Sequence, residues 1–489
     1  MRIQPVVQSR LKLGVVVGTL CVSLSSPAHV TDARKPVAAT ASISVDHLEQ
    51  YSGLAVTWMQ EYLRINTTNP PGNEMRAVKF YKRILDGEGI ETREFEYEPG
   101  RGDLWARIPH TCADGAAKRP LILLNHTDVV TSDPMHWKVP PFSGEIRDGY
   151  IYGRGAQDMK DEGVAQLMVM IMLKREKVAL DRDVIFLAVA DEEVGDTGTD
   201  WFIASHRDLL ENAEFLITEG GENPLENGHV KYVGVDVGEK TTYWLHVVAH
   251  GRPGHGSRPN PDSAPNRLVR ALDRILAYRT PMRVLPVVDE FLRAMAPYQT
   301  GERAAWYRDI RKAIGEKRFQ DEVERDESLN FLLRDTISLT MLGGSEQTNV
   351  IPSEAWANLD VRVLPGGDPN ALVESLRQVV EDPDVTIEPL DARFRVANYS
   401  GTDNALFGAI REVAGRYFPD APVVPHITSG YTENQCYRPL GIVSYGFNPY
   451  AATADEGESE HGNDERIRVD EVRRGPRVLF DVVARVAGE

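Results

Sequence analysis

One stretch of nine residues constrains the fold more than any other part of the sequence. It runs from Pro120 to Asp128 and reads P-L-I-L-L-N-H-T-D. Four consecutive leucine and isoleucine residues without polar alternation indicate a strand buried on both faces, as in the middle of a parallel sheet covered by helices. Ligands and catalytic groups in such sheets gather just beyond the carboxyl ends of the strands. The stretch therefore predicts an α/β domain and places His126 and Asp128 at a candidate site.

Further acidic residues and a second histidine follow the same pattern. Glu192 and Glu193 end the apolar stretch V-I-F-L-A-V-A-D-E-E, and Glu219 ends E-F-L-I-T-E-G-G. Asp158 stands in G-R-G-A-Q-D-M-K-D, and His461 in S-E-H-G-N-D-E. Two imidazoles and several carboxylates are the donor groups that first-row metal ions accept. These segments therefore indicate a metal site.

The chain is long enough for two domains. With 489 residues it exceeds what one hydrophobic core usually supports. Up to Gly238, strands expected at 92–97, 103–108, 120–126, 184–190 and 214–218 alternate with helices at 45–64, 74–88, 160–176 and 199–210, which indicates a three-layer α/β domain. The next segment follows the order β-α-β-β-α-β of a ferredoxin-like unit, with strands at 243–249, 336–342, 356–363 and 385–390 and helices at 261–278 and 370–380.

The end of the chain returns to the first pattern, with helices at 405–418 and 469–486 and a strand at 442–447. The second domain is therefore predicted to be inserted into the first. The boundaries that we expect are 1–28 for a signal peptide, 29–44 for a flexible leader, 45–238 and 397–489 for the two parts of the catalytic domain, and 239–396 for the inserted domain, which contains a charged helical insertion at 281–334.

The amino terminus has the features of an export signal. Three basic residues precede an apolar stretch at 13–24, and Ser26-Pro27-Ala28 supplies small residues for cleavage. The alternative is an uncleaved membrane anchor, but twelve residues are too few to span a bilayer comfortably. We therefore expect a secreted or periplasmic protein that is not in the membrane after cleavage. Of its three cysteines, Cys112 and Cys436 would remain, and the sequence leaves open whether they form a disulfide.

The net charge excludes some partners. A formal charge of -18 at pH 7 would repel nucleic acid and anionic membrane surfaces. We therefore expect neither as a partner.

The adjacent pair Glu192 and Glu193 indicates hydrolysis. Neighbouring side chains at a strand end point in different directions. One carboxylate can therefore bind a metal while the other acts as a general base on a water whose pKa the metal lowers to about 7. Taken alone, such a pair is more often a solvated turn. The combination with the other acidic and histidine motifs disfavours that interpretation.

Five motifs in order carry a resemblance to a known family. They are His126-x-Asp128, Gly153-Arg-Gly-x-x-Asp158, Asp191-Glu-Glu-x-Gly195, Glu219-Gly220 and His461. The chain resembles, over nearly all of its length after residue 45, the co-catalytic zinc peptidases that include aminoacylase, glutamate carboxypeptidase, the carnosine-type dipeptidases and succinyl-diaminopimelate desuccinylase. This resemblance implies a three-layer zinc-peptidase catalytic domain with an inserted ferredoxin-like lid and dimerisation domain.

The resemblance also implies roles for these residues. The site would hold two divalent metal ions, with zinc expected and cobalt or manganese as alternatives. Asp128 would orient the imidazole of His126, and Glu192 would be the general base and acid. A cis peptide bond is expected between Asp158 and Met159. The implied metal ligands are His126 and Glu219 for the first ion, Glu193 and His461 for the second, and Asp158 for both.

Residues of the second domain would complete the site. In relatives, a histidine that matches His255, in Gly254-His-Gly-Ser257, stabilises the oxyanion in a neighbouring subunit, which implies a homodimer. Asn349 matches a substrate contact in the lid. Arg362 resembles an arginine that binds a substrate carboxylate, although an ordinary surface arginine is an equal alternative. The chain departs from the family where it has Thr432-Glu433 and Gln435, which puts the substrate pocket in doubt.

The expected function is that of an exported metal-dependent hydrolase. It would cleave a small amide or peptide bond, as a carboxypeptidase or dipeptidase does, by means of a metal-bridging hydroxide. The alternatives are an aminoacylase acting on N-acyl amino acids, a single-metal esterase or lactamase, and a non-catalytic binding protein. A serine hydrolase is disfavoured because the sequence has no G-x-S-x-G motif. The histidines His136, His229 and His426 have no partner at metal-ligand spacing and are expected to be structural or exposed.

Overall fold

A computed structural model describes residues 43–113, 116–210, 212–390, 395–428 and 430–488. The predicted signal peptide lies outside these residues, as does nearly all of the predicted leader. The largest element of the described structure is an eight-stranded mixed sheet with the order β1-β2-β6-β3-β7-β19-β10-β18. None of the helices in the described ranges combines the length and the apolar character that a bilayer span requires.

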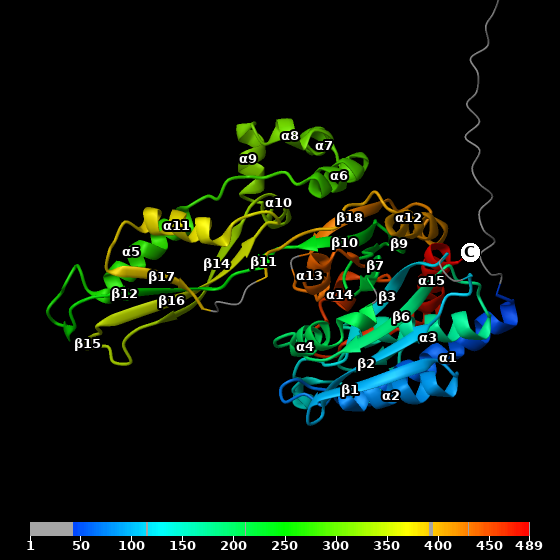
Figure 1. The fold of residues 1–489 in the computed structure, drawn as a ribbon. Helices are drawn as coiled ribbons and strands as arrows, with labels where there is room; N and C mark the ends of the chain where they lie inside the picture. The colour runs from blue at the N-terminus through cyan, green and yellow to red at the C-terminus, as the bar shows by residue number, and fades with distance from the viewer. Residues whose placement is uncertain (1–42, 114–115, 211, 391–394, 429, 489) are drawn as a thin grey trace, which may run out of the picture. The chain divides into compact units, whose positions relative to one another are not determined.

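Four neighbouring strands form the parallel centre of the large sheet (Figure 1). They are β6 (Arg182–Val189), β3 (Lys118–His126), β7 (Phe215–Thr218) and β19 (Val443–Gly446), and adjacent members pair in parallel. Residues 120–126 of β3 are all buried. The prediction of a central strand with helices on both faces is confirmed.

The two faces of β3 contribute to different hydrophobic cores. Leu121 and Leu123 belong to one buried cluster, whereas Ile122 and Leu124 belong to another. This alternation follows from the period of two in a strand and requires a covering layer on each side. The first cluster lies beneath α1 (Val45–Leu63), α2 (Met75–Gly87), α3 (Lys160–Arg175), α12 (Ala405–Tyr417) and α15 (Val469–Ala487), and the second beneath α4 (Thr197–Ser205) and η2 (Arg207–Leu210).

Two strands of the large sheet were not predicted. β10 (Val233–Glu239) contains two glycines, and β18 (Val423–Thr428) contains Pro425, so neither has an ordinary strand composition. A proline is tolerated in β18 because this strand lies at the edge of the sheet. The opposite edge is formed by β1 (Glu91–Glu98) beside β2 (Arg101–Ile108).

A second, antiparallel sheet has the order β14-β16-β12-β17, and β11 (Thr241–Thr242) pairs with one end of β16. Its own core includes residues from two helices. The inserted ferredoxin-like unit is therefore confirmed. Its elements are β12 (Leu245–His250), α5 (Ala264–Ala277), β14 (Thr336–Gly343), β16 (Glu354–Val363), α11 (Pro369–Val380) and β17 (Val385–Pro389).

Most buried apolar residues of the helical insertion belong to the first core. Its buried residues Val288, Leu292 and Phe319 share a cluster with the large sheet. Phe291 contacts the rings of Tyr232 and His426. The insertion thus covers edge strand β18. Its helices are α6 (Pro286–Met295), η3 (Ala296–Tyr298), α7 (Gly301–Arg308), α8 (Ile310–Ala313), α9 (Lys317–Val323) and α10 (Glu327–Leu333).

Short elements complete the described chain. They are η1 (Pro134–His136), β4 (Glu145–Arg147), β5 (Tyr150–Tyr152), β8 (Leu225–Glu226), β9 (His229–Val230), β13 (Gly254–His255), β15 (Val350–Ile351), α13 (Asn434–Tyr437), η4 (Arg438–Leu440), α14 (Ala454–Gly457) and β20 (Arg466–Arg468).

Candidate active site

The candidate site lies where three neighbouring parallel strands end. His126 is the last residue of β3, Glu192 and Glu193 follow β6, and Glu219 follows β7. Because β6, β3 and β7 are adjacent and parallel, their carboxyl ends lie side by side. Residues far apart in the sequence are thus brought together by the sheet.

Asp158 lies between the two histidines of the site. Its Oδ1 is 2.9 Å from Nε2 of His126, and its Oδ2 is 2.8 Å from Nε2 of His461. Each imidazole nitrogen also meets a glutamate, at 3.3 Å in both cases: Glu219 for His126 and Glu193 for His461. The five predicted metal ligands therefore form one cluster with Asp158 at its centre. The peptide bond after Asp158 is cis, as expected.

Glu192 and Glu193 diverge from the strand end. Glu193 approaches His461, and its other oxygen accepts a hydrogen bond from the backbone N–H of Val130 at 3.2 Å. A carboxylate oxygen of Glu192 lies instead within 4.8 Å of ligand atoms of His126 and Glu219. The two side chains therefore serve different parts of the cluster.

The charges of this cluster fit bound cations. Burial raises the pKa of Glu219 to about 8, and burial together with the Glu219 charge raises the pKa of Glu192 well above its ordinary value. Hydrogen bonds to Asp158 and Glu193 raise the pKa of His461 to about 10. So many buried carboxylates repel one another unless protons or cations compensate them. Histidine and carboxylate donors at these distances can hold divalent metal ions.

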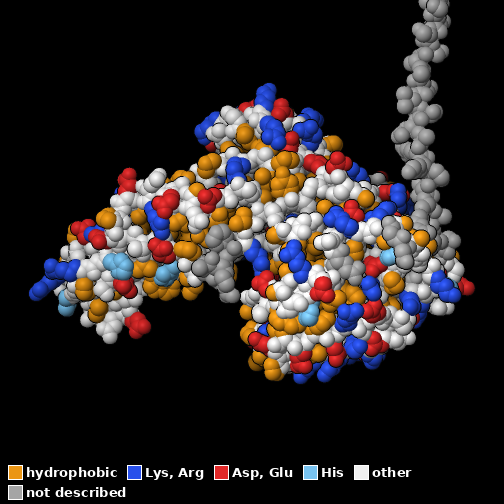
Figure 2. Space-filling model, viewed as in Figure 1, with side chains coloured by type: hydrophobic (Ala, Val, Ile, Leu, Met, Phe, Trp, Pro, Cys, Tyr) orange, Lys and Arg blue, Asp and Glu red, His pale blue; other side chains and the backbone are white. Residues whose placement is uncertain are grey.

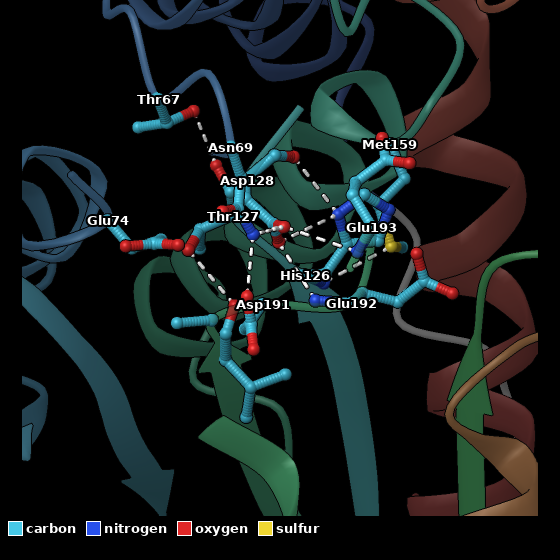
Figure 3. Close-up of polar contacts among 12 residues, drawn as sticks. Thr67, Asn69, Glu74, His126, Thr127, Asp128, Met159, Asp191, Glu192 and Glu193 are labelled. Carbon is cyan, nitrogen blue, oxygen red and sulfur yellow. Dashed lines mark hydrogen bonds and ion pairs between the residues drawn. The ribbon is translucent and has the colours of Figure 1, made fainter. Parts of the chain in front are cut away.

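Asp128 holds the backbone of the glutamate pair. Its Oδ1 accepts a hydrogen bond from the N–H of Glu192 at 3.1 Å, and its Oδ2 accepts one from the N–H of Glu193 at 3.2 Å (Figure 3). Nδ1 of His126 lies 3.6 Å from Oδ1 of Asp128 and 3.1 Å from its backbone oxygen. Nδ1 of His126 is therefore within hydrogen-bond distance of the backbone oxygen of Asp128, with the carboxylate close by.

A cavity of about 470 Å³ opens over the cluster. It includes Asp158, Glu192, Glu193, Glu219 and His461 in its walls. The remaining lining residues include Gln157, Glu162, Gly220, Gly221, Glu222, Asp236, His426, Thr428, Tyr431, Thr432, Asn448 and Glu460.

Sequence reasoning missed the position of His426. It lies on β18, which was not predicted, and lines the cavity with a side chain that is 21% exposed. Its Nδ1 is 2.7 Å from Oδ1 of Asp236, whose other oxygen accepts a hydrogen bond from the N–H of Gly221. No metal ligand stands at a suitable spacing from His426 in the sequence, and Asp236 is 190 residues away. The pairing of β10 with β18 was therefore needed to find this residue.

The three candidate residues of the second domain have contacts within that domain. His255 on β13 is exposed and pairs in register with Val350 of β15, and the neighbouring Asn349 is also exposed. Histidine side chains are visible at the surface over β12 and β16 (Figure 2). Arg362 on β16 contacts Asp360 at 2.7 Å and Thr242 at 2.9 Å. None of the three is among the described residues that line the cavity.

Most of the residues that depart from the family pattern are buried behind the wall of the cavity. Glu433 is fully buried and accepts a hydrogen bond from the hydroxyl of Thr199. Gln435 is buried and donates to the backbone oxygen of Lys240. Only Thr432 of this segment is among the described lining residues, since neither Glu433 nor Gln435 is one of them. Cys112 and Cys436 are both free.

Comparisons with known proteins agree with the predicted family. Rat (Rattus norvegicus) aminoacylase-1B is 28% identical over 443 residues, covering 88% of this chain and 95% of that protein. The M20 family metallo-carboxypeptidase of Sulfolobus solfataricus has a similar fold, with a TM-score of 0.65 and 20% identity over 88% of this chain and 98% of the other. Human carnosine dipeptidase 1 gives a TM-score of 0.62 with 15% identity over 90% and 97% of the two chains.

A family profile extends this result to most of the sequence. Residues 122–485 match peptidase family M20/M25/M40, a range that contains every residue of the cluster. The order of the motifs, the ferredoxin-like insertion and this match agree. The chain therefore belongs to peptidase family M20/M25/M40 and is a metal-dependent hydrolase.

Proposed function

We propose that this protein hydrolyses N-acyl amino acids at a centre of two divalent cations, with dipeptides as the second candidate substrate. One observation carries the two-cation proposal. The two oxygens of Asp158 face His126 and His461 separately, at 2.9 and 2.8 Å. A single carboxylate of this kind can be shared by two cations about 3.5–4 Å apart.

Each cation would have its own histidine and glutamate. His126 and Glu219 would hold the first, and His461 and Glu193 the second, with Asp158 between them. Zinc suits these donors, and cobalt or manganese can replace it. When bound, such cations lower the pKa of water to about 7 and polarise a carbonyl oxygen.

Glu192 would move the proton in this reaction. It faces the cavity, takes a proton from the attacking water and delivers it to the leaving amide nitrogen. Burial and the nearby Glu219 charge raise the pKa of Glu192, which suits a group that must both accept and return a proton. Asp128 supports it by holding the backbone N–H of Glu192.

The choice between the two substrate classes rests on the comparisons. Aminoacylase-1B aligns over 95% of its own length, and this supports N-acyl amino acids as the first candidate. The order of the candidates thus differs from the one expected from motifs alone. The similar structures of a carboxypeptidase and a dipeptidase keep peptides as the second candidate.

Residues of the inserted domain would complete the site in a homodimer. His255 of a partner chain would stabilise the oxyanion, as the resemblance implies. Asn349 and Arg362 would contact the substrate, and Arg362 would bind its carboxylate.

Export is part of the proposal. The basic residues and the apolar stretch at 13–24 support a cleaved signal and a secreted or periplasmic protein. Mass spectrometry of the protein recovered from outside the cytoplasm should show a new amino terminus near residue 29. An intact amino terminus would contradict cleavage.

A paired assay tests the catalytic proposal. The metal-depleted protein is reloaded with zinc, cobalt or manganese and given N-acetyl amino acids and dipeptides. Glu192→Gln should retain its metal and lose about 10²–10⁴-fold in kcat. Glu214→Gln is a matched control, since Glu214 pairs with Arg182 just before β7, at the opposite end of that strand from Glu219. Full activity of Glu192→Gln would refute its role as the base.

A further inference from the structure

A buried set of polar side chains lies behind the metal-ligand cluster. We call it the Asn69 network, and its members contact one another in an unbroken series. Four of them are at most 4% exposed, and the Arg101 side chain is 16% exposed. The members are Glu74, Arg101, Asp191, Asn69 and Asp128.

Asn69 joins two carboxylates through one amide group. Its Nδ2 donates to Oδ2 of Asp128 at 2.8 Å and to Oδ1 of Asp191 at 2.7 Å (Figure 3). A side-chain amide has two N–H groups, so both are used, one for each carboxylate. Without these donors the two buried negative charges would face each other directly.

The backbone around Asn69 is fixed to the strand end that carries the site. The N–H of Asn69 donates to the oxygen of Val129 at 2.9 Å, and the N–H of Val129 donates to the oxygen of Thr67 at 3.2 Å. This pairing places Asn69 beside the residue that follows Asp128. These two backbone hydrogen bonds fix the main chain at Asn69, and so they place its side-chain amide beside Asp128.

On the site side, the network ends at one carboxylate that touches three functional groups. Asp128 lies against the imidazole of His126 and accepts the backbone N–H groups of Glu192 and Glu193. A rotation of Asp128 would therefore disturb a metal ligand and the proposed base together. Groups behind metal ligands commonly change metal affinity or activity 10–100-fold when they are replaced.

On the far side, the network is fixed by an arginine. Nη2 of Arg101 donates to Asp191 at 2.7 Å and to Glu74 at 2.7 Å, while its Nε donates to Glu74 at 3.0 Å. Arg101 is the first residue of β2, so the network extends to another strand of the large sheet. Arg101 thus fixes the carboxylate of Asp191, which in turn accepts the hydrogen bond from Asn69.

We propose that Asn69 is a positioning residue of the active site: it fixes the Asp128 carboxylate and thereby the orientation of His126 and Glu192. This inference rests on the proposed function, because it assigns Asn69 a role toward the metal ligands and the base. It predicts that loss of the amide weakens metal binding and lowers kcat in the metal-loaded enzyme.

Thr67 provides a matched control on the same segment. It is fully buried, and its hydroxyl donates to the backbone oxygen of Thr127 at 2.6 Å, one residue before Asp128. Thr67→Val removes a buried hydrogen bond without touching the Asp128 carboxylate. A merely structural effect should therefore be the same in Thr67→Val and in variants of Asn69.

The test compares Asn69→Leu and Asn69→Ser with Thr67→Val in the full chain. Cobalt(II) is titrated into each metal-depleted protein and followed by visible absorption; thermal unfolding and the kcat and KM of the loaded enzymes are then measured. We expect all variants to lose some stability. The Asn69 variants should in addition lose about 10–100-fold in cobalt affinity or kcat, whereas Thr67→Val stays within about twofold of the wild type.

The outcomes separate this inference from the proposed function. If the wild type binds cobalt and both Asn69 variants match Thr67→Val in affinity and kcat, the positioning role is refuted. If Asn69→Leu does not fold, Asn69→Ser decides, because its smaller side chain removes the amide without adding bulk. If the wild type itself binds no cobalt, the proposed metal centre fails and the inference with it.

Discussion

The cluster at the strand ends of the large sheet and the candidate residues of the inserted domain differ in how they are held. The ligand atoms of His126, Asp158 and Glu193 lie within 4.8 Å of one another, and the Asn69 network contacts Asp128 behind them. His255 on β13 and Asn349, just before β15, are exposed. In the first region the candidate ligands already lie close to one another, whereas the roles proposed for residues of the second region depend on a substrate or a partner chain.

This difference reflects the two kinds of sheet. In the large sheet, neighbouring parallel strands end at the same edge, so the fold itself brings their last residues together. In the inserted domain, His255 on β13 and Asn349 just before β15 belong to a separate two-stranded sheet and its flank, and only Arg362 lies on the second sheet. The strand order therefore does not bring these three residues together. Variants in each region should therefore affect different measured quantities.

The largest effect is expected from the shared carboxylate. Asp158→Asn keeps the shape of the side chain but removes the charge that two cations would share, so we expect a loss of at least about 10³-fold in kcat and of metal content. Asp360→Asn is a control in the second sheet, where Asp360 pairs with Arg362. Metal analysis and steady-state kinetics measure both. Equal effects of the two variants would remove the distinction between the regions.

His255 should give the next largest effect and tests the homodimer. His255→Ala should lower kcat about 10²–10³-fold with normal metal content, as loss of an oxyanion donor does. Mixing His255→Ala with Glu192→Gln should restore activity toward about a quarter of the wild type, since mixed dimers of a two-fold assembly contain one intact site. No restoration on mixing, together with a monomeric mass in solution, would contradict a role across subunits.

Arg362 should have a smaller, kinetic effect. Arg362→Gln should raise KM for N-acetyl amino acids about tenfold with kcat retained, because a charge-assisted hydrogen bond contributes roughly 1.5–3 kcal/mol. The guanidinium now contacts Asp360 and Thr242, so binding substrate competes with these contacts. An unchanged KM would contradict a role of Arg362 in binding the substrate carboxylate.

The smallest effect on activity is expected at Lys240, between β10 and β11, where the chain passes from the first sheet to the second. Burial lowers the pKa of Lys240 from 10.5 to about 7, and the side chain is 1% exposed. Below pH 7 Lys240 is charged in both the folded and the unfolded state, and burying this charge lowers the free energy of unfolding. This loss of stability becomes smaller as the pH rises from about 7 toward 10.5, because the folded protein then binds fewer protons than the unfolded chain.

Lys240→Met should accordingly stabilise the protein at acidic pH by roughly 1–3 kcal/mol and lose this advantage toward pH 10. Urea unfolding at several pH values measures the difference. Lys174→Met is a control, since Lys174 is exposed and also donates to a backbone oxygen, that of Gly89. A pH-independent difference for Lys240→Met would contradict the lowered pKa.

Much of the fold could be predicted because its central features are local in sequence. The apolar strand at 120–126 and the order β-α-β-β-α-β are patterns that a single chain displays directly. The five residues of the cluster follow buried strands or stand in motifs with a fixed order. Strand ends at one sheet edge bring His126, Glu193 and Glu219 together. Asp158 and His461 stand in loops, and the motif order was the only signal for them.

The remaining features depend on contacts that no local pattern encodes. Asn69 stands in a turn-like T-N-P-P-G segment, and its partners Asp128 and Asp191 are remote in sequence. His426 lies on an edge strand with a proline, a composition that argues against a strand. The helical insertion carries an ordinary amphipathic pattern that shows a buried face but not which core buries it.

Crystals of the zinc-loaded protein, with anomalous diffraction measured at the zinc absorption edge, test the central claim most directly. The account predicts two peaks per chain about 3.5–4 Å apart, one beside His126 and Glu219 and the other beside His461 and Glu193, with Asp158 between them. A single peak, or peaks that do not touch Asp158, would contradict it.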